Sequence, residues 1–204
     1  MPYPTKRLTF SDLCFDVYED VYEPAEDSFL FAENLHIEAG MSVLDLGTGC
    51  GILAVLAAKK TDVVVAVDLN PSAMRCAKEN AHLNGVCDRI AFLRGDLFGT
   101  LRAGVRFDLV LFNAPYLPSD AGEEATWIGR SWAGGADGRL VVDRFITEVL
   151  AYLKPAGRVL LMQSTLTGVE KTLRGFSQQG FSAYVVAERS LPFFETLTLI
   201  EANV

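Results

Sequence analysis

Two kinds of hydrophobic pattern alternate along the chain. Apolar runs of five or six residues are typical of strands buried on both faces, whereas segments with apolar residues at every third or fourth position are typical of amphipathic helices. The runs predict strands at residues 41–46, 63–67, 89–94, 107–112, 158–163, 183–187 and 196–201.

Helical patterns lie between these strands. The pattern after the second strand has clear end signals, with Asn70 as N-cap, Pro71 at the first helical position and Gly85 just beyond the end. The other helices are expected at residues 52–60, 139–153 and 167–179. Strand and helix alternation predicts a mostly parallel sheet with helices on both faces. The short SLPFF connection between the last two strands predicts a C-terminal antiparallel hairpin.

Composition and charge remove several function classes. Half of the 204 residues are hydrophobic, yet none of the runs reaches the ~18 apolar residues of a membrane span. The first residues do not resemble a signal peptide, which predicts a cytoplasmic protein. A net charge of −8 with scattered Lys and Arg disfavours direct nucleic-acid binding. The four cysteines form no CxxC pair and only two histidines are present, so we expect reduced, buried thiols and no metal site.

Polar side chains follow each of the first four predicted strands. Asp45, Asp68, Asp96 and Asn113 stand at or just beyond the four ends. The carboxyl ends of parallel strands meet at one edge of the sheet, where ligands bind close to the point at which the strand order reverses. Side-chain packing does not require a polar residue at the end of each of four strands, so we expect a ligand pocket there.

The segment DLGTGCG begins at Asp45, and its glycines permit a sharp turn and close approach of a ligand to the backbone. Its GxGxG spacing differs from the GxGxxG of dinucleotide-binding proteins, and no P-loop lysine follows. Asp68 stands at about the 20-residue offset at which a carboxylate meets a ribose. Asp96 can accept a hydrogen bond from an adenine amino group, and Leu97 offers apolar area to the ring. A tight turn and two helix-start carboxylates without a ligand are the simpler alternative.

The segment NAPY follows the fourth strand. The Asn113 side-chain oxygen and the carbonyl of Ala114 or Pro115 are two acceptors for the hydrogens of a planar NH2 group. Such a nitrogen is a weak nucleophile, and two acceptors can aim its lone pair at a methyl donor. Pro115 stiffens the turn, and Tyr116 gives a flat face for a substrate amide. A turn with an Asx cap is the alternative.

In combination these features resemble the class I S-adenosylmethionine-dependent methyltransferases over residues 20–204. The resemblance implies a single methyltransferase domain, with an N-terminal extension and capping helix at residues 1–40 and a Rossmann-like core at 41–204. It also implies that Asp45 and Gly47 border the methionine half of the cofactor, Asp68 holds the ribose, and Asp96 with Leu97 receives the adenine. NAPY is similar to the NPPY motif of amino-group methyltransferases, with Ala114 in place of the first proline.

Two more segments, VYEPAEDSF at residues 21–29 and WAGGADGRLVVDRF at 132–145, narrow the resemblance to the HemK family, in its short archaeal and eukaryotic branch. This implies methylation of the glutamine amide in the GGQ motif of class I release factors, with Ser28 at the carboxylate end of the cofactor. Glu26 and Asp27 would line the same side. It further implies a small zinc-binding activator protein along an edge strand, expected to be IAFLR.

The expected site residues follow from these motifs and resemblances. The catalytic residues are Asn113, Pro115 and Tyr116, and the cofactor-binding residues are Ser28, Asp45, Gly47, Gly49, Asp68, Asp96, Leu97 and Asn113. Residues 119–138, with two tryptophans among glycines, are expected to form an unstructured substrate loop, or to be anchored in the core through those tryptophans.

Four other functions share some of these features. A nucleic-acid amino-group methyltransferase would use the same pocket with an added basic face, and a protein-lysine methyltransferase would use the same acceptors. A nicotinamide dehydrogenase would share the sheet and Asp68, and a cofactor-binding subunit without activity would share the whole pocket.

Overall fold

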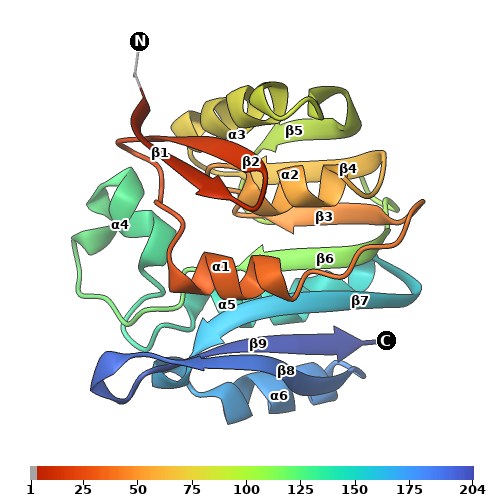
Figure 1. The fold of residues 1–204 in the computed structure, drawn as a ribbon. Helices are drawn as coiled ribbons and strands as arrows, with labels where there is room; N and C mark the ends of the chain where they lie inside the picture. The colour runs from red at the N-terminus through yellow and green to blue at the C-terminus, as the bar shows by residue number, and fades with distance from the viewer. Residues whose placement is uncertain (1–3) are drawn as a thin grey trace.

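The seven predicted strands form one sheet in the computed structural model, which describes residues 4–204 (Figure 1). The strand order is β5-β4-β3-β6-β7-β9-β8. The strands are β3 (Ser42–Leu46), β4 (Val63–Asp68), β5 (Ile90–Arg94), β6 (Phe107–Asn113), β7 (Leu153–Ser164), β8 (Ser182–Ser190) and β9 (Thr196–Asn203). The pairs from β5 to β7 are parallel, and β9 pairs antiparallel with both β7 and β8. The predicted α/β sheet with its C-terminal hairpin is therefore confirmed.

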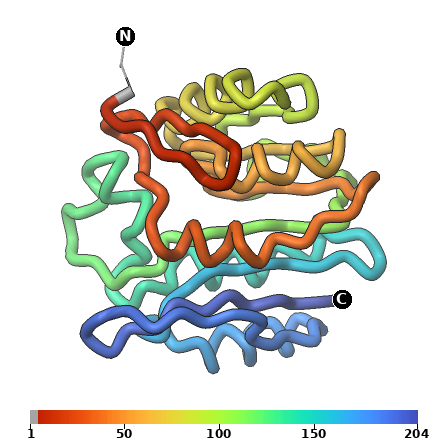
Figure 2. Tube along the Cα trace, viewed as in Figure 1, coloured from red at the N-terminus to blue at the C-terminus, as the bar shows by residue number. Residues whose placement is uncertain are grey.

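Helices cover both faces of this sheet (Figures 1 and 2). They are α1 (Glu26–Glu33), α2 (Ile52–Ala58), α3 (Pro71–Leu83), α4 (Trp127–Trp132), α5 (Leu140–Glu148) and α6 (Val169–Gln178). The side chains of strand β6 pack into two hydrophobic clusters, one on each face of the sheet. Leu109 and Leu111 pack with α1 and α2 on one face, while Val110 and Phe112 pack with α5 and α6 on the other. Because both faces are covered, the strand is apolar from Leu109 to Phe112.

The end signals of α3 act as predicted. The Asn70 side chain accepts a hydrogen bond from the Ser72 backbone N–H at 2.8 Å, and Pro71 is the first helical residue. Gly85 follows the helix with φ +69, a conformation that glycine adopts without strain.

The predicted end of the helix at residues 139–153 is wrong. Helix α5 stops at Glu148, a short 3-10 helix spans Val149–Tyr152, and Leu153 already begins β7. Pro155 disfavours helical backbone at Lys154, so the chain is already extended there. Nothing in the sequence explains the earlier change from α-helix to 3-10 helix at Val149. The apolar positions that looked helical thus belong to three elements, α5, the 3-10 helix and β7. The last helix is also shorter than predicted, since a 3-10 turn (Thr165–Thr167) and Gly168 precede α6.

An N-terminal hairpin went unpredicted. Strands β1 (Pro4–Phe10) and β2 (Leu13–Tyr18) pair antiparallel, and β2 lies against α3. The Asn80 side chain fixes this contact, since it accepts from the Asp16 N–H at 2.8 Å and donates to the Asp16 carbonyl at 2.8 Å. The β-prone residues of LCFDVY, with Phe15 and Val17 on either side of Asp16, are the signal that could have revealed the strand.

All four cysteines are free, but Cys14 and Cys87 are only half-buried, so the expectation of burial holds for Cys50 and Cys76 alone. Within residues 4–204, each helix is too short or too polar to cross a membrane.

The sheet topology creates a crevice. From β3 the chain moves outward through β4 to β5 and then returns to place β6 on the other side of β3. The strand order therefore reverses between β3 and β6, which end at Leu46 and Asn113. At such a reversal the connections leave in opposite directions and open a ligand crevice.

Candidate active site

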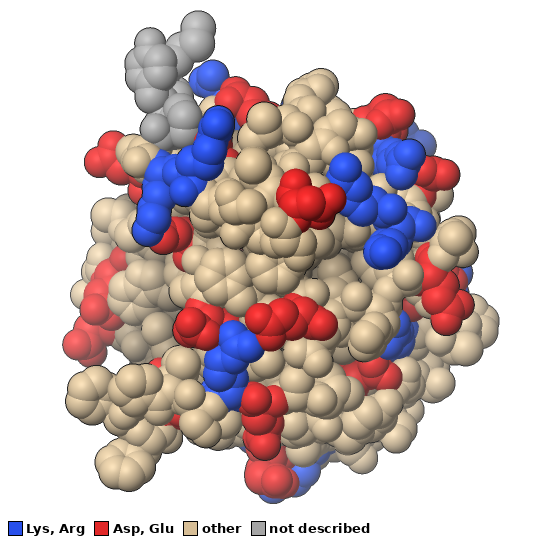
Figure 3. All heavy atoms as spheres, viewed as in Figure 1, with Lys and Arg blue, Asp and Glu red and all other residues tan. Residues whose placement is uncertain are grey.

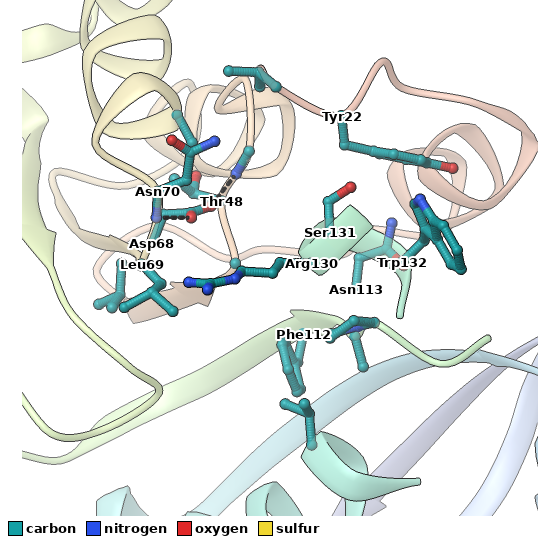
Figure 4. Close-up of a pocket in the computed structure, with 18 of the residues that line it drawn as sticks. Tyr22, Thr48, Asp68, Leu69, Asn70, Phe112, Asn113, Arg130, Ser131 and Trp132 are labelled. Atoms are coloured by element: carbon teal, nitrogen blue, oxygen red, sulfur yellow. Dashed lines mark hydrogen bonds between the residues drawn. The ribbon is translucent and has the colours of Figure 1, made fainter. Parts of the chain in front are cut away.

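A cavity of about 700 Å³ opens at the carboxyl ends of β3, β4, β5 and β6. Its walls include every residue expected at the site: Ser28, Asp45, Gly47, Gly49, Asp68, Asp96, Leu97, Asn113, Pro115 and Tyr116. Figure 4 shows two groups of side chains in it. Thr48, Asp68 and Asn70 lie on one side and Tyr22, Asn113 and Trp132 on the other. We call these sides the cofactor half and the substrate half, after the ligands expected there from the sequence.

The glycine turn builds the cofactor half. Gly47, Gly49 and Gly51 have φ of +64, +56 and +88, in the left-handed region that favours glycine. A Cβ on Gly51 would stand 2.9 Å from the Cα of Ala77, so this glycine also lets α2 pack closely on α3. The Thr48 N–H donates to the Val67 carbonyl at 3.0 Å, which ties the turn to β4.

Asp45 is a buried carboxylate with spare acceptor capacity. Only 1% of the residue is exposed, and its Oδ2 accepts from the Thr48 hydroxyl at 2.6 Å. Its Oδ1 is buried without a partner among the described residues. Burial raises the pKa of Asp45 to about 7, and the nearby charge of Asp68 acts in the same direction. A positively charged ligand would stabilise the ionised form of Asp45 against both effects. These carboxylates therefore suit a sulfonium cofactor better than a negatively charged pyrophosphate.

Asp68 is positioned by two backbone groups. Its Oδ2 accepts from the Gly49 N–H at 2.9 Å and its Oδ1 from the Asn70 N–H at 2.8 Å. Burial nevertheless raises the pKa of this carboxyl. Each carboxylate oxygen has a second lone pair, so Asp68 can still accept from a ligand hydroxyl.

The adenine end differs from the expectation in one contact. Asp96 accepts from the Arg144 guanidinium of α5 at 3.0 Å, and the Asp96 side chain is 54% exposed. The carboxylate is thus partly neutralised before a ligand arrives. Leu97 adopts φ +45, an uncommon conformation for a bulky residue, and presents its side chain to the cavity.

Asp27 organises the substrate half. Its Oδ2 accepts from Asn113 Nδ2 at 3.1 Å, and its Oδ1 accepts from the Ser28 N–H at 2.6 Å and the Ser28 hydroxyl at 3.2 Å. Because the amide nitrogen of Asn113 is held in this way, the amide oxygen points away from Asp27. The Oδ1 atom of Asn113 is buried and has no hydrogen-bond partner among residues 4–204. An unpaired buried acceptor is costly, which makes it a candidate for a ligand donor.

Two tyrosines complete this network. The Tyr22 hydroxyl lies 3.3 Å from Asp27 Oδ1, and the Tyr116 hydroxyl lies 3.5 Å from Asp27 Oδ2. Burial and then the charge of Asp27 raise the pKa of both phenols, so both stay protonated donors. Tyr116 is buried, with its side chain in the cavity wall as predicted.

The connection at residues 119–138 is structured in part, which corrects the expectation of an unstructured loop. It contains a 3-10 helix (Glu123–Ala125) and α4, whose N-cap Thr126 accepts from the Gly129 N–H at 3.0 Å. Both Trp127 and Trp132 line the cavity. The Arg130 guanidinium lies 5.0 Å from the centroid of Trp127, and Figure 4 places it between the two halves.

The end of this connection packs tightly on the NAPY turn. A Cβ on Gly138 would stand 2.3 Å from the Tyr116 carbonyl oxygen and 2.3 Å from Thr167 Cγ2. Next to it, the buried Arg139 donates to the Thr167 carbonyl at 2.7 Å. WAGGADGR therefore holds the turn and the start of α6 together.

Sequence reasoning missed part of the site. Glu26 was expected beside Asp27, yet it pairs with Arg189 at 2.8 Å on the surface. Asp27 was expected only as a lining residue, whereas it contacts four cavity groups. Tyr22 and Asn70 also line the cavity. A tyrosine before a helix and an aspartate in its first turn were the available signal, although neither specifies a contact with NAPY.

The comparisons with known proteins agree with this geometry. Residues 11–114 match the family model described as Ribosomal protein L11 methyltransferase (PrmA). A Methanocaldococcus jannaschii protein with the provisional name protein N5-glutamine methyltransferase is 40% identical over 185 residues, covering 90% of this chain and 92% of that protein. Methyltransferase HEMK2 of Homo sapiens is 32% identical over 197 residues, covering 90% of each.

A solved structure is similar as well. The E. cuniculi Mtq2–Trm112 complex, described as responsible for methylation of the eRF1 translation termination factor, superposes with a TM-score of 0.70 at 26% identity. The match covers 90% of this chain and 98% of that one. The L11 family model ends at Ala114, within NAPY, whereas the M. jannaschii and human relatives each cover 90% of the chain. The chain therefore belongs to the HemK family of protein glutamine N-methyltransferases.

Proposed function

We propose that this enzyme methylates the side-chain amide nitrogen of the GGQ glutamine in a class I translation release factor, with S-adenosylmethionine as donor. The E. cuniculi relative, described as acting on eRF1, supports this substrate class. When bound, the cofactor supplies a methyl group on a positively charged sulfur. Asp45, Gly47 and Gly49 would border its methionine part, with Ser28 at the carboxylate end, while Asp68 would hold the ribose and Asp96 with Leu97 the adenine.

The observation that carries the proposal is the unpartnered amide oxygen of Asn113. A glutamine amide brings two N–H donors, and this oxygen can accept one of them. The carbonyl of Ala114 or Pro115 can accept the other, because both residues line the same cavity. Held between two acceptors, the nitrogen is oriented, and the positive charge that develops on it is stabilised without reorganisation of the site. Tyr116 would pack its ring on the amide plane.

A methylation assay tests the proposal. Wild-type enzyme with labelled cofactor is expected to add one methyl group to the GGQ glutamine of a release factor, located by mass spectrometry. Asn113→Ala should slow the transfer by about 10²–10³-fold, as for the loss of one stabilising contact to the reacting centre. Asn203→Ala, a change of the same type far from the cavity on β9, should retain wild-type activity. Label on RNA, DNA or lysine, or an Asn113→Ala rate within threefold of wild type, would overturn the assignment.

We further propose that a small zinc-binding partner protein docks along β5. This strand is an edge of the sheet, so one row of its backbone groups can pair with another chain. The E. cuniculi relative, solved in complex with Trm112, supports such a partner. Phe92→Asp beside this edge should abolish co-elution with the partner, while Val186→Asp on the opposite edge strand β8 should not. Equal effects of the two variants would contradict this location.

A further inference from the structure

The turn between β8 and β9 exposes two phenylalanines almost completely. Phe193 is 94% exposed and Phe194 is 103% exposed. The turn is closed by the Leu191 N–H, which donates to the Glu195 carbonyl at 2.8 Å. We call Phe193 and Phe194 the hairpin tip. Single apolar residues are common on protein surfaces. Two adjacent exposed aromatic rings at a projecting turn are uncommon.

The backbone of the hairpin tip is unfavourable for these residues. Phe193 and Phe194 have φ of +63 and +65, in the left-handed region that glycine and asparagine adopt with least strain. Hairpin turns therefore favour those two residues. Two large apolar side chains at this turn therefore lower stability in two ways, because the rings are exposed to water and the backbone is in an unfavourable conformation. A local conflict of this kind points to a role outside folding.

The hairpin tip lies at the mouth of the substrate half. In Figure 1 the β8–β9 turn projects on the same side of the molecule as α4. Arg189, just before the turn, pairs with Glu26 at 2.8 Å and with Glu33 at 2.6 Å, which fastens the hairpin to α1, the helix that carries Asp27. Glu195, just after the tip, lies close enough to the cavity for its charge to contribute to the raised pKa of Tyr22 and Tyr116.

Carboxylates without an ion pair lie near this mouth, together with the guanidinium group of Arg130 in the cavity wall. Neither Glu195 behind the tip nor Glu124 in the cavity wall has a salt-bridge partner within the part of the chain that the structure describes. The same holds for Asp120, at the start of the connection that contains α4. Figure 3 shows acidic atoms over that connection and an uncharged protrusion over the β8–β9 turn. An apolar anchor beside unpaired carboxylates complements a surface with an apolar contact and basic residues.

We propose that Phe193 and Phe194 are a docking element for the protein substrate, which they bind through an apolar patch flanked by basic residues while its glutamine enters the cavity. This inference rests on the proposed function, because it assigns the occupant as the release factor. The contact lies outside the reacting centre, so it contributes equally to the ground state and the transition state. Such uniform binding lowers KM and leaves kcat unchanged.

Steady-state kinetics with two substrates test the docking element. The double variant Phe193→Ser with Phe194→Ser should raise KM for the intact release factor at least tenfold, with kcat within twofold of wild type. Its KM for a short peptide that carries only the target glutamine segment should not change, nor should its affinity for S-adenosylmethionine. The matched control is Val105→Ser with Leu150→Ser, two residues that are each 37% exposed and lie toward the amino ends of β6 and β7. This control should behave as wild type.

A second variant separates docking from folding. Phe193→Asn with Phe194→Gly suits the left-handed turn, so its thermal midpoint should equal or exceed that of wild type, while KM for the intact release factor rises as in the serine variant. Unchanged KM in both tip variants would overturn the proposal, as would an equal KM increase for the short peptide. A concentration-dependent dimer of wild type that the tip variants abolish would assign the tip to a second copy of the chain and would also overturn it. If wild type transfers no methyl group to the release factor, the proposed function fails and the docking inference falls with it.

Discussion

The two halves of the cavity are built in different ways. In the cofactor half, Asp45 and Asp68 stand at the ends of adjacent strands, and their partners Thr48, Gly49 and Asn70 lie within one turn or at most 19 residues along the chain. In the substrate half, Asn113 is oriented by Asp27, which is 86 residues away. The first half is a product of local turns and parallel register. The second depends on where α1 docks against the end of β6.

Because of this difference, we expect separate effects on cofactor binding and on methyl transfer. In the cofactor half, two backbone N–H groups fix Asp68 and the Thr48 hydroxyl holds Asp45. The substrate half relies on side chains that hold one another, with Asp27 at the centre. Changes to Asp27 should therefore impair transfer more than cofactor binding, which Asp27 affects only through Ser28 and Asn113. Protonation of Asp45 should instead weaken cofactor binding. Three measurements test this division.

The largest effect is expected from Asp27→Asn. An asparagine can donate to the Asn113 side chain as well as accept from it, so the oxygen of Asn113 is no longer fixed toward the substrate. We expect kcat to fall by about 10–100-fold, the scale of misorienting a positioned catalytic group. The affinity for S-adenosylmethionine, measured by calorimetry, should change less than threefold.

Glu26→Gln is the matched control for this variant. It alters the neighbouring carboxylate, which pairs with Arg189 on the surface, and exposed pairs of this type contribute little. Its kcat should equal that of wild type. If both variants lose activity equally, or if Asp27→Asn loses cofactor binding as severely as turnover, the two halves are not separable.

A tenfold effect is expected from pH on the cofactor half. The pKa of Asp45 is raised to about 7 by burial, so the carboxyl becomes protonated as the pH falls through that value. The ionised form favours a cationic ligand, hence affinity for S-adenosylmethionine should decrease by about tenfold between pH 8 and pH 6. Calorimetry in buffers of different ionisation enthalpy should also detect proton release on binding near pH 7.

Asp45→Asn sharpens this result. The variant should bind weakly, with an affinity independent of pH. Since the folded protein binds the Asp45 proton more tightly than the unfolded chain does, this carboxyl lowers stability as the pH rises from about 4 to 7. Asp45→Asn should accordingly gain stability relative to wild type at pH 8. An unchanged pH dependence of binding in Asp45→Asn would assign the titration to another group.

The smallest effect on activity is expected where Gly138, in the connection at residues 119–138, packs against the NAPY turn. Gly138→Ala places a Cβ against the Tyr116 carbonyl and Thr167, so the turn must shift. We expect KM for the protein substrate to rise about fivefold and the free energy of unfolding to fall by about 1–3 kcal/mol, as for overpacking. Gly122→Ala is the control, because its φ is also positive but no atom lies within 4 Å of the added Cβ. Chemical denaturation compares the two, and equal losses would assign the effect to backbone strain alone.

The predictability of the site follows the same division. Asp45, Asp68 and Asn113 could be placed from the sequence because each ends an apolar run, and parallel strands bring such ends together whatever the helices do. The role of Asp27 could not be found in this way, because it depends on side-chain contacts across two distant segments. Likewise the helix start after Asn70 was readable from local signals, while the end of α5 was misread because its apolar spacing continued into β7.

The free oxygen of Asn113 bears on how many methyl groups one glutamine receives. An unmodified amide offers two hydrogens to two acceptors, whereas a singly methylated amide retains one and turns a methyl group toward the other acceptor. The product therefore fits the site less well than the starting amide. A turnover should end with departure of the monomethylated side chain, and a dimethylated residue should not accumulate even with excess donor.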